Sequence, residues 1–202
     1  MSFGPLEVEF DPSVLEPRPW TLLQSEWAIE LAAALPDGPV LEMCSGAGQI
    51  GQVVALATGR DLVQVDSSPA ACSYATSNAR RNGLESQVEV YCAEIRGAAD
   101  PDLGAGAFPL VLADPPYLPT SECREFPLDP IGAIDGGPDG LRIVASMIAS
   151  ISRHLRPEGV ALLQLWGRSQ VLQVDRLDLQ DLEIDDIRAH DPRRAVALLR
   201  RK

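Results

Sequence analysis

The sequence contains little that could build a metal site or a disulfide framework. Among its 202 residues are only two histidines and four cysteines. The cysteines, Cys44, Cys72, Cys92 and Cys123, are widely spaced and form no C-x-x-C pair. Metal sites and disulfide frameworks need denser and more regular sets of ligands or cysteines. We therefore expect no metal, and we expect the four thiols to be reduced and buried.

Membrane-spanning runs and a signal peptide are also absent. No apolar stretch is long enough to cross a bilayer, and the first ten residues carry acids and proline where a signal peptide needs a basic start and an apolar block. Because 46% of the residues are hydrophobic, the chain can bury one sizeable core. We expect a cytoplasmic protein without a membrane partner. An N-terminal extension and first helix over 1–36 should pack on a core over 37–202, and the two parts should form a single globular domain.

Basic residues are fewer than acidic residues. Seventeen Lys and Arg stand against 29 Asp and Glu, which gives a formal net charge of -12. Affinity for nucleic acid comes mainly from Lys and Arg that neutralise phosphates, so a broad contact with nucleic acid is disfavoured. A cationic protein or a small substrate fits this charge better. The basic C-terminal stretch over 193–202 is interpreted as an exposed edge strand that its Arg and Lys keep soluble, with an RNA or DNA contact as the alternative.

From Pro39 onward, short apolar runs alternate with helical patterns, which is typical of a parallel sheet with helices on both faces. The segments "LEIDDIRA" and "AVALLRR" are separated by the turn formers Asp191 and Pro192 and predict a C-terminal antiparallel hairpin. The expected fold is α/β, with a seven-stranded, mostly parallel sheet. Helices are predicted over 20–35, 49–58, 68–82 and 139–155.

The stretch "GAGQIG", from Gly46 to Gly51, matches the G-x-G-x-x-G loop between a strand and a helix. Asp66 follows 20 residues after Gly46, where an acid would hold ribose hydroxyls, so NAD is one interpretation. Glu42 lies at the end of the preceding strand and favours a ligand with a cationic amino group over a pyrophosphate, whose negative charge it would oppose. A tight turn without a ligand and an incidental acid at Glu42 are the alternatives.

The stretch "DPPY", from Asp114 to Tyr117, directly follows a predicted strand and resembles the [DN]-P-P-[YF] motif of S-adenosylmethionine-dependent methyltransferases that modify planar amino nitrogens. Such a nitrogen is a poor nucleophile and must be held by its hydrogens. Asp114 and the carbonyl of Pro115 can accept those hydrogen bonds, Pro115 and Pro116 fix the backbone, and Tyr117 offers a flat face for stacking. A solvated Pro-Pro turn is the alternative.

Both motifs begin at carboxyl ends of predicted strands, so they should face one crevice. A hydride transferase has no use for two acceptors aimed at an amine, and this argues against NAD. Neither His154 nor His190 lies in a motif loop, so we expect no catalytic role for them.

From about Val14 to Arg201, the chain resembles the HemK family of protein-(glutamine-N5) methyltransferases. The resemblance is carried by "VLEPRPWT", "VLEMCSGAGQIG", "VDSSPAACSYATSNARRNGL" and "AIDGGPDGLRIV". It implies a Rossmann-like class I methyltransferase fold that uses S-adenosylmethionine. It also implies that the methyl acceptor is a planar amide nitrogen, the glutamine side chain of a protein such as a peptide-chain release factor.

The same resemblance implies roles for individual residues. Asp114 to Tyr117 would hold the substrate, and Asp114 would also border the cofactor. The remaining cofactor residues would be Gly46 and Gly48 against the cofactor itself, Glu42 near its amino acid part, Asp66 at the ribose hydroxyls, and Glu94 near the adenine amino group. Ser67, next to Asp66, is also expected to contact the cofactor.

Three departures from the family pattern keep rival functions open. Cys44 replaces the first glycine of the cofactor loop, and Asp114 stands where release-factor enzymes usually have Asn. The chain also starts almost at the catalytic domain, without the helical domain with which bacterial members grip their release factor. Shorter members work with a small activator subunit, which is therefore an expected partner. The rivals are a nucleic-acid base methyltransferase acting on adenine N6 or guanine N2, a small-molecule methyltransferase, and an inactive cofactor-binding subunit.

Overall fold

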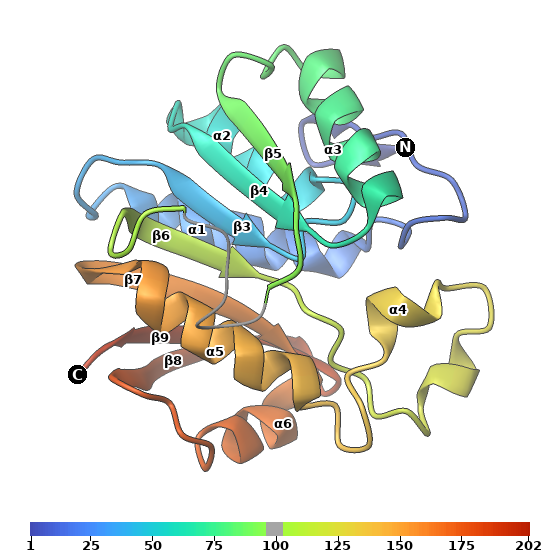
Figure 1. Ribbon diagram of the computed structural model, residues 1–202, viewed down its shortest axis with the longest axis vertical. Coiled ribbons are helices and arrows are strands. Elements are labelled where there is room, and N and C mark those ends of the chain that lie inside the picture. The colour runs from blue at the N-terminus through green and yellow to red at the C-terminus, as the bar shows by residue number, and fades with distance from the viewer. Residues whose placement is uncertain (96–102) are drawn as a thin grey trace.

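The computed structural model describes residues 1–95 and 103–202 and is built around a seven-stranded sheet (Figure 1). The strand order is β5-β4-β3-β6-β7-β9-β8. The first five strands in this order, from β5 to β7, pair in parallel with their neighbours. Strand β9 is antiparallel to both β7 and β8. The predicted mixed sheet with a C-terminal hairpin is confirmed. The strands are β3 (Val40–Met43), β4 (Leu62–Asp66), β5 (Val88–Cys92), β6 (Phe108–Ala113), β7 (Leu155–Leu165), β8 (Leu182–Asp191) and β9 (Arg194–Arg201).

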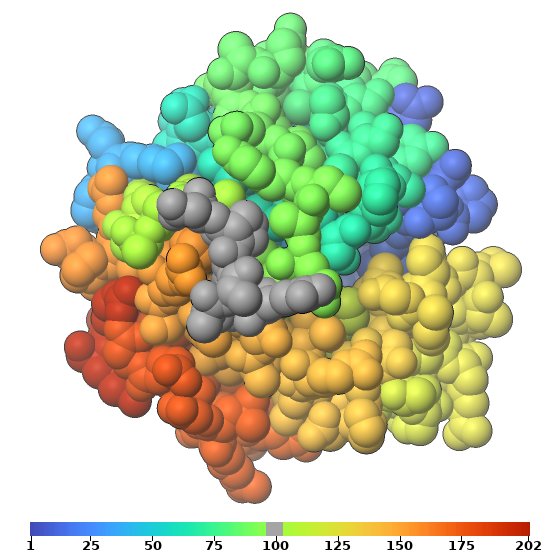
Figure 2. All heavy atoms as spheres, in the orientation of Figure 1, coloured from blue at the N-terminus to red at the C-terminus, as the bar shows by residue number. Residues whose placement is uncertain are grey.

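Helices cover both faces of the sheet (Figure 1). One face carries α1 (Leu22–Ala32), α2 (Gln49–Thr58) and α3 (Pro69–Arg81), and the other carries α5 (Arg142–His154) and α6 (Gly167–Val174). The short elements are β1 (Ser2–Phe3), β2 (Leu6–Glu7), α4 (Ile131–Ile134) and the 3-10 turns Pro19–Thr21 and Cys123–Glu125. In the space-filling view, side chains fill most of the spaces that separate the ribbons (Figure 2).

The predicted helix limits hold closely where the sequence supplies a cap. The Ser68 hydroxyl accepts from the Ala71 backbone N–H at 3.3 Å, and Pro69 is the first helical residue of α3. The helix predicted over 139–155 begins only at Arg142. Gly140 has a φ of +77°, a left-handed conformation that an α-helix cannot include. The helix predicted over 20–35 starts as a 3-10 turn and ends at Ala32.

The apolar residues form two main clusters, one on each face of the sheet. Leu41 and Met43 of β3 belong to the cluster under α5 and α6, whereas Val40 belongs to the cluster under α1 and α2. Phe3 and Trp27 join the second cluster, so the N-terminal segment packs on the sheet. The division of the chain into 1–36 and 37–202 stays a prediction.

The interpretation of 193–202 as an edge strand is wrong. Strand β9 lies between β7 and β8, and β8 forms the edge of the sheet. Its basic residues form ion pairs with acids of neighbouring segments: Arg194 with Asp191, Arg200 with Asp185, and Arg201 with Asp181. The sequence could not reveal this order because a hairpin can dock on the sheet by either of its two strands.

The cysteines are free, but they are not all buried as predicted. Cys72 and Cys123 are buried, Cys44 is partly exposed, and Cys92 is exposed because β5 forms the other edge of the sheet. Among the described residues, no helix combines the length and the apolar character that crossing a bilayer would require.

Candidate active site

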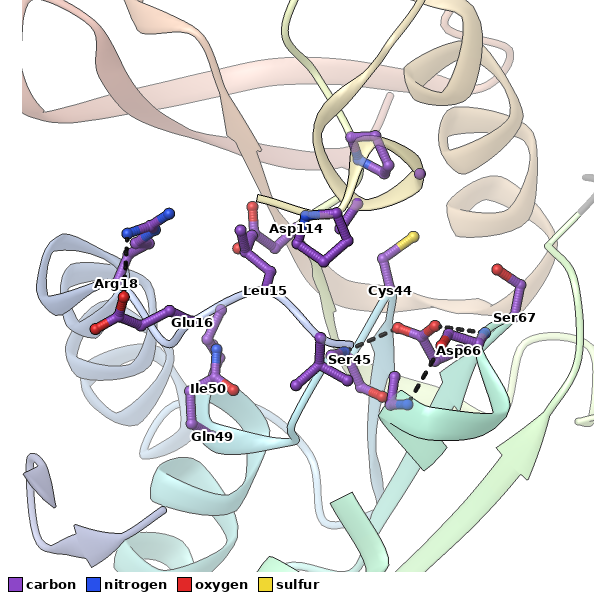
Figure 3. Close-up of a pocket in the computed structure, with 18 of the residues that line it drawn as sticks. Leu15, Glu16, Arg18, Cys44, Ser45, Gln49, Ile50, Asp66, Ser67 and Asp114 are labelled. Atoms are coloured by element: carbon purple, nitrogen blue, oxygen red, sulfur yellow. Dashed lines mark hydrogen bonds and ion pairs between the residues drawn. The ribbon is translucent and has the colours of Figure 1, made fainter. Parts of the chain in front are cut away.

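The carboxyl ends of β3, β4 and β6 border a cavity of about 240 Å³. Figure 3 shows Asp66 and Ser67 towards one end of it, Glu16 and Arg18 towards the other, and Asp114 between them. The cavity thus lies where ligands bind in open α/β sheets. Its lining residues are Ser13, Val14, Leu15, Glu16, Arg18, Thr21, Cys44, Ser45, Gly46, Gln49, Ile50, Asp66, Ser67, Ser68, Ala71, Asp114, Pro116, Pro130, Gly132 and Ala133.

The predicted glycine loop forms the turn from β3 into α2. Gly46 lines the cavity with a φ of +53°, and a Cβ added there would meet no other atom within 4 Å. Gly48 caps α2 with a φ of +88°, but it is packed behind the loop, where an added Cβ would come within 2.5 Å of Gln52 Nε2. Gly46 therefore borders the cavity, whereas Gly48 shapes the turn behind it.

Cys44 replaces a glycine of the family pattern in a conformation that favours glycine. Its φ is +58°, and its side chain lines the cavity. Burial raises the pKa of its thiol, and the nearby carboxylates of Asp66, Asp114 and Glu42 act in the same direction. The residue is therefore present as a neutral thiol on the cavity wall.

Asp66 lies at the end of β4, as predicted, and its carboxylate is held by two backbone groups. Oδ2 accepts from Gly46 N at 2.8 Å and Oδ1 accepts from Ser68 N at 2.9 Å. Burial raises the pKa of Asp66, while these hydrogen bonds oppose the rise. Each carboxylate oxygen can accept a second hydrogen bond, so the fixed carboxylate can still receive hydroxyl groups of a ligand. Ser67 lies beside it on the cavity wall.

Glu42 lies under the glycine loop and does not line the cavity. Its side chain is buried, with a relative exposure of 2% for the residue, and it accepts a hydrogen bond from Gln64 Nε2. The same amide group donates to the Gly48 carbonyl at 3.0 Å. Burial raises the pKa of Glu42 to about 8, against the opposing effect of the Gln64 bond. The acid thus supports the loop from below.

Two polar groups on the cavity wall lack partners within the described residues. Ser45 Oγ and Gln49 Oε1 are buried without a hydrogen bond. Buried polar atoms normally find partners, so these two are available to hydrogen-bond a polar ligand in the cavity. The sequence interpretation missed both, although their positions within the glycine loop and at the start of α2 were available as a signal.

A second, smaller cavity of about 50 Å³ adjoins the first at Asp114. Pro115, Tyr117 and Trp166 line it, and the rings of Tyr117 and Trp166 are stacked with centroids 6.3 Å apart. Burial raises the pKa of Asp114 to about 7. Within the described residues, its carboxylate has no hydrogen-bond partner. Asp114 is therefore a carboxyl group available to ligands in both cavities.

Part of the wall of the second cavity is made by residues far apart in the sequence. Arg18 donates to both carboxylate oxygens of Asp129 at 2.5 Å. The guanidinium of Arg194 lies 3.6 Å from the centroid of the Trp20 ring. All four residues line this cavity. The sequence interpretation did not identify them, since no local pattern joins positions so widely separated.

The remaining predicted residues are placed as follows. Pro116 lines the larger cavity, and Pro115 and Tyr117 line the smaller one. Glu94 is exposed just beyond β5 and lines neither cavity. The structure thus brings the glycine loop, Asp66 and the Asp114–Tyr117 segment together, and it does not bring Glu94 to them.

Comparison with known proteins was made by sequence and by structure. No family model matches the chain. The release factor glutamine methyltransferase of Mycobacterium leprae is 33% identical to it, with 94% of this chain and 67% of the relative covered. The chain belongs to this family. The enzyme of the same name from Gloeobacter violaceus is 36% identical over 79% of this chain and 57% of its own length.

The family members differ from this chain in length. It spans a little over half of the relatives from Gloeobacter violaceus and Mycolicibacterium smegmatis. Among solved structures, the hMettl16 catalytic domain has a TM-score of 0.77 at 15% identity, with 97% of this chain and 74% of that chain covered. A methyltransferase from Aquifex aeolicus described as dependent on SAM has a TM-score of 0.64 at 14% identity, with 95% and 98% covered. These similarities confirm the predicted fold class.

Proposed function

We propose that this family member transfers a methyl group from S-adenosylmethionine to the side-chain amide nitrogen of a glutamine in a peptide-chain release factor. One observation carries the proposal: Asp114 borders both cavities. The larger cavity has the glycine loop and Asp66, which suit a nucleoside. The smaller cavity is lined by Pro115 and Tyr117, whose carbonyl and ring would suit a planar amide. Donor and acceptor would therefore meet at Asp114.

The charges around the larger cavity fit this cofactor. The carboxylates of Glu16, Asp66 and Asp114 line it, against the single guanidinium of Arg18, which is paired with Asp129 and Glu16. Such a surface attracts a cationic ligand and repels a pyrophosphate. S-adenosylmethionine carries a sulfonium and an ammonium group, whereas NAD carries two phosphates. The unpaired polar atoms of the wall also fit the hydrogen-bonding groups of S-adenosylmethionine.

Individual residues would hold the cofactor in distinct ways. The Asp66 carboxylate would accept from the ribose hydroxyls, and Ser45 Oγ and Gln49 Oε1 would receive partners from its polar groups. Gly46 would allow close approach because no Cβ projects from it. When bound, S-adenosylmethionine supplies an electrophilic methyl group on a positively charged sulfur.

The acceptor would be oriented by the second motif. An amide nitrogen shares its lone pair with the carbonyl group and attacks poorly unless it is positioned. The ionised Asp114 carboxylate and the Pro115 carbonyl would each accept one hydrogen of the NH2 group, while the Tyr117 ring packs against its plane. This arrangement would direct the nitrogen towards the methyl group. Asp114 would also lie close enough to accept the proton that the nitrogen loses.

The choice of a protein glutamine over a nucleobase rests on charge and on family. Both oxygens of Asp can accept the bond that Asn accepts through one oxygen, so Asp114 alone does not distinguish the two acceptors. The net charge of -12 opposes a phosphate backbone. A glutamine on a Gly-flanked protein loop meets no such repulsion. A small activator subunit is a further proposed partner.

The test is a transfer assay with labelled methyl donor. The protein, with and without a small activator subunit, is offered a release factor, the variant of that factor whose Gly-Gly-Gln glutamine is Ala, total RNA, and unmethylated DNA. The Asp114→Ala protein serves as the matched control for background label. We expect label only in the unchanged release factor. Label in nucleic acid, or equal label in the Gln→Ala factor, would refute the glutamine assignment.

A further inference from the structure

Gln170, in the first turn of α6, joins three segments around the second cavity. Its Nε2 donates to the Tyr117 carbonyl at 2.8 Å and lies 3.5 Å from the Gly140 carbonyl. Its Oε1 accepts from the Trp166 backbone N–H at 2.7 Å. The residue is 3% exposed, so water does not replace these contacts. A side-chain amide donates through its nitrogen and accepts through its oxygen, so it can hold two backbone groups of opposite polarity at the same time.

The Tyr117 carbonyl is the point at which the acceptor segment is fixed. A Cβ added at Gly140 would lie 2.2 Å from this oxygen, so the two segments are in close contact there. The next residue continues the contact, because Leu118 N donates to the Ile134 carbonyl at 3.0 Å and Gly136 N donates to the Leu118 carbonyl at 2.8 Å. Gln170 closes this set of bonds from the side of α6.

Gln170 also reaches the aromatic wall through Trp166. The bond to the Trp166 N–H fixes the backbone from which the indole ring extends, and that ring stacks on Tyr117 at an interplanar angle of 29°. One amide thus holds the backbone of both stacked residues. If this amide were lost, the Tyr117 ring could rotate or shift against its neighbour.

We propose that Gln170 is a positioning residue for the methyl acceptor. It acts through Tyr117 and Trp166 and touches neither cavity itself. The inference rests on the proposed function for the identity of the acceptor. The fixed geometry of the Tyr117 segment is independent of which acceptor is bound. Since misplacement by about 1 Å can cost about a hundredfold in rate, such a support matters to turnover.

The first experiment measures the geometry without any substrate. Gln170→Leu removes both hydrogen-bonding functions, and Gln170→Glu keeps the acceptor for Trp166 but loses the donor to Tyr117. The control is Asn82→Leu, because Asn82 also makes three hydrogen bonds through its amide but holds residue 7 and α3, remote from both cavities. Hydrogen exchange is followed at the amides of Leu118 and Gly136. We expect both Gln170 variants to exchange there at least about tenfold faster, and Asn82→Leu to match the unchanged protein.

The second experiment measures kinetics with the release factor as acceptor. For Gln170→Leu, we expect kcat/KM for the acceptor to fall at least about tenfold, while the dissociation constant of the cofactor stays within about twofold. The defect of Gln170→Glu, relative to the unchanged protein at each pH, should shrink at low pH. A protonated carboxyl can donate to the Tyr117 carbonyl again. Gln170→Leu should show no such recovery.

The outcomes separate this inference from the proposed function. If the unchanged protein methylates no glutamine, the proposed function fails, and hydrogen exchange still decides the positioning role. Exchange at Leu118 and Gly136 that is unaltered in Gln170→Leu would overturn the inference. It would also be overturned if Gln170→Leu and Asn82→Leu lowered acceptor kcat/KM equally, because Gln170 would then be contributing only to general stability.

Discussion

The titration of Asp114 should control activity near neutral pH. The carboxyl borders both cavities, and burial raises its pKa to about 7. Only the ionised form presents two oxygens that accept hydrogen bonds from an NH2 group. Asp114→Asn removes the ionisation but keeps one amide oxygen as an acceptor. We expect the variant to keep part of its activity, because Asn can orient the NH2 group but cannot accept its proton, and to lose the pH dependence that arises from this group.

The size of the effect follows from the ionised fraction. With a pKa of about 7, roughly a tenth of the carboxyl is ionised at about pH 6 and roughly nine tenths at about pH 8. The kcat/KM of the unchanged protein, measured at limiting cofactor, should therefore rise about tenfold across this interval. Bound S-adenosylmethionine adds a positive charge nearby, so the midpoint should move below pH 7 at saturating cofactor.

Asp114 should make the folded protein less stable as pH rises, whereas an Asp with a lowered pKa makes it more stable. Because the folded pKa lies above the unfolded value of 3.8, the ionised form is disfavoured in the fold, and stability is lost as pH rises from about 4 to about 7. At pH 8, the free energy of unfolding of Asp114→Asn should exceed that of the unchanged protein by at most about 4 kcal/mol, so the variant should unfold at a higher denaturant concentration. At pH 4, the two proteins should unfold at the same denaturant concentration. A variant whose pH–rate profile keeps the step near pH 7 would refute this reasoning.

Two further pairs of substitutions test the division of roles between Asp66 and Asp114 and the packing of the glycine loop. Asp66→Ala should weaken cofactor binding at least about tenfold in isothermal titration, while Asp114→Ala abolishes turnover and leaves cofactor affinity within about threefold. Similar behaviour of the two would contradict separate roles. Gly48→Ala and Gly59→Ala both place Ala at positive φ, but only the first Cβ meets a close neighbour. Denaturation should show a loss of about 1 kcal/mol for Gly59→Ala and about 2–3 kcal/mol for Gly48→Ala. Equal losses would rule out crowding at Gly48.

The sequence predicted the fold well where local signals and the layer pattern agree. The limits of α2 were predicted to the residue, and α3 was predicted to within one residue at each end, because Ser68 and Pro69 mark its start and Asn82 and Gly83 its end. The helix predicted over 139–155 began too early because nothing local reveals the left-handed conformation of Gly140. The close approach of the Tyr117 carbonyl, a contact between distant segments, also leaves no room for a side chain at Gly140.

Much of the site could also be predicted, because each motif follows a strand whose carboxyl end faces the crevice. Asp66 and Asp114 were found in this way, and both line the cavity. Glu42 was predicted to lie near the ligand, but its carboxyl turns under the loop towards Gln64. The alternation of side chains along a strand predicts the face of the sheet on which Glu42 lies. It does not predict the hydrogen-bond partner of Glu42, because that partner comes from the neighbouring strand.

The sequence by itself determined the layer pattern, the positions of the two motif loops and the acids that end their strands, since each of these depends on residues adjacent in the chain. Only the tertiary structure decided that β9 is an inner strand, that Arg18 and Asp129 meet across 111 positions, and that Gln170 holds the Tyr117 segment. These are contacts between segments far apart in sequence, whose formation depends on how whole elements pack. No local propensity or spacing encodes them.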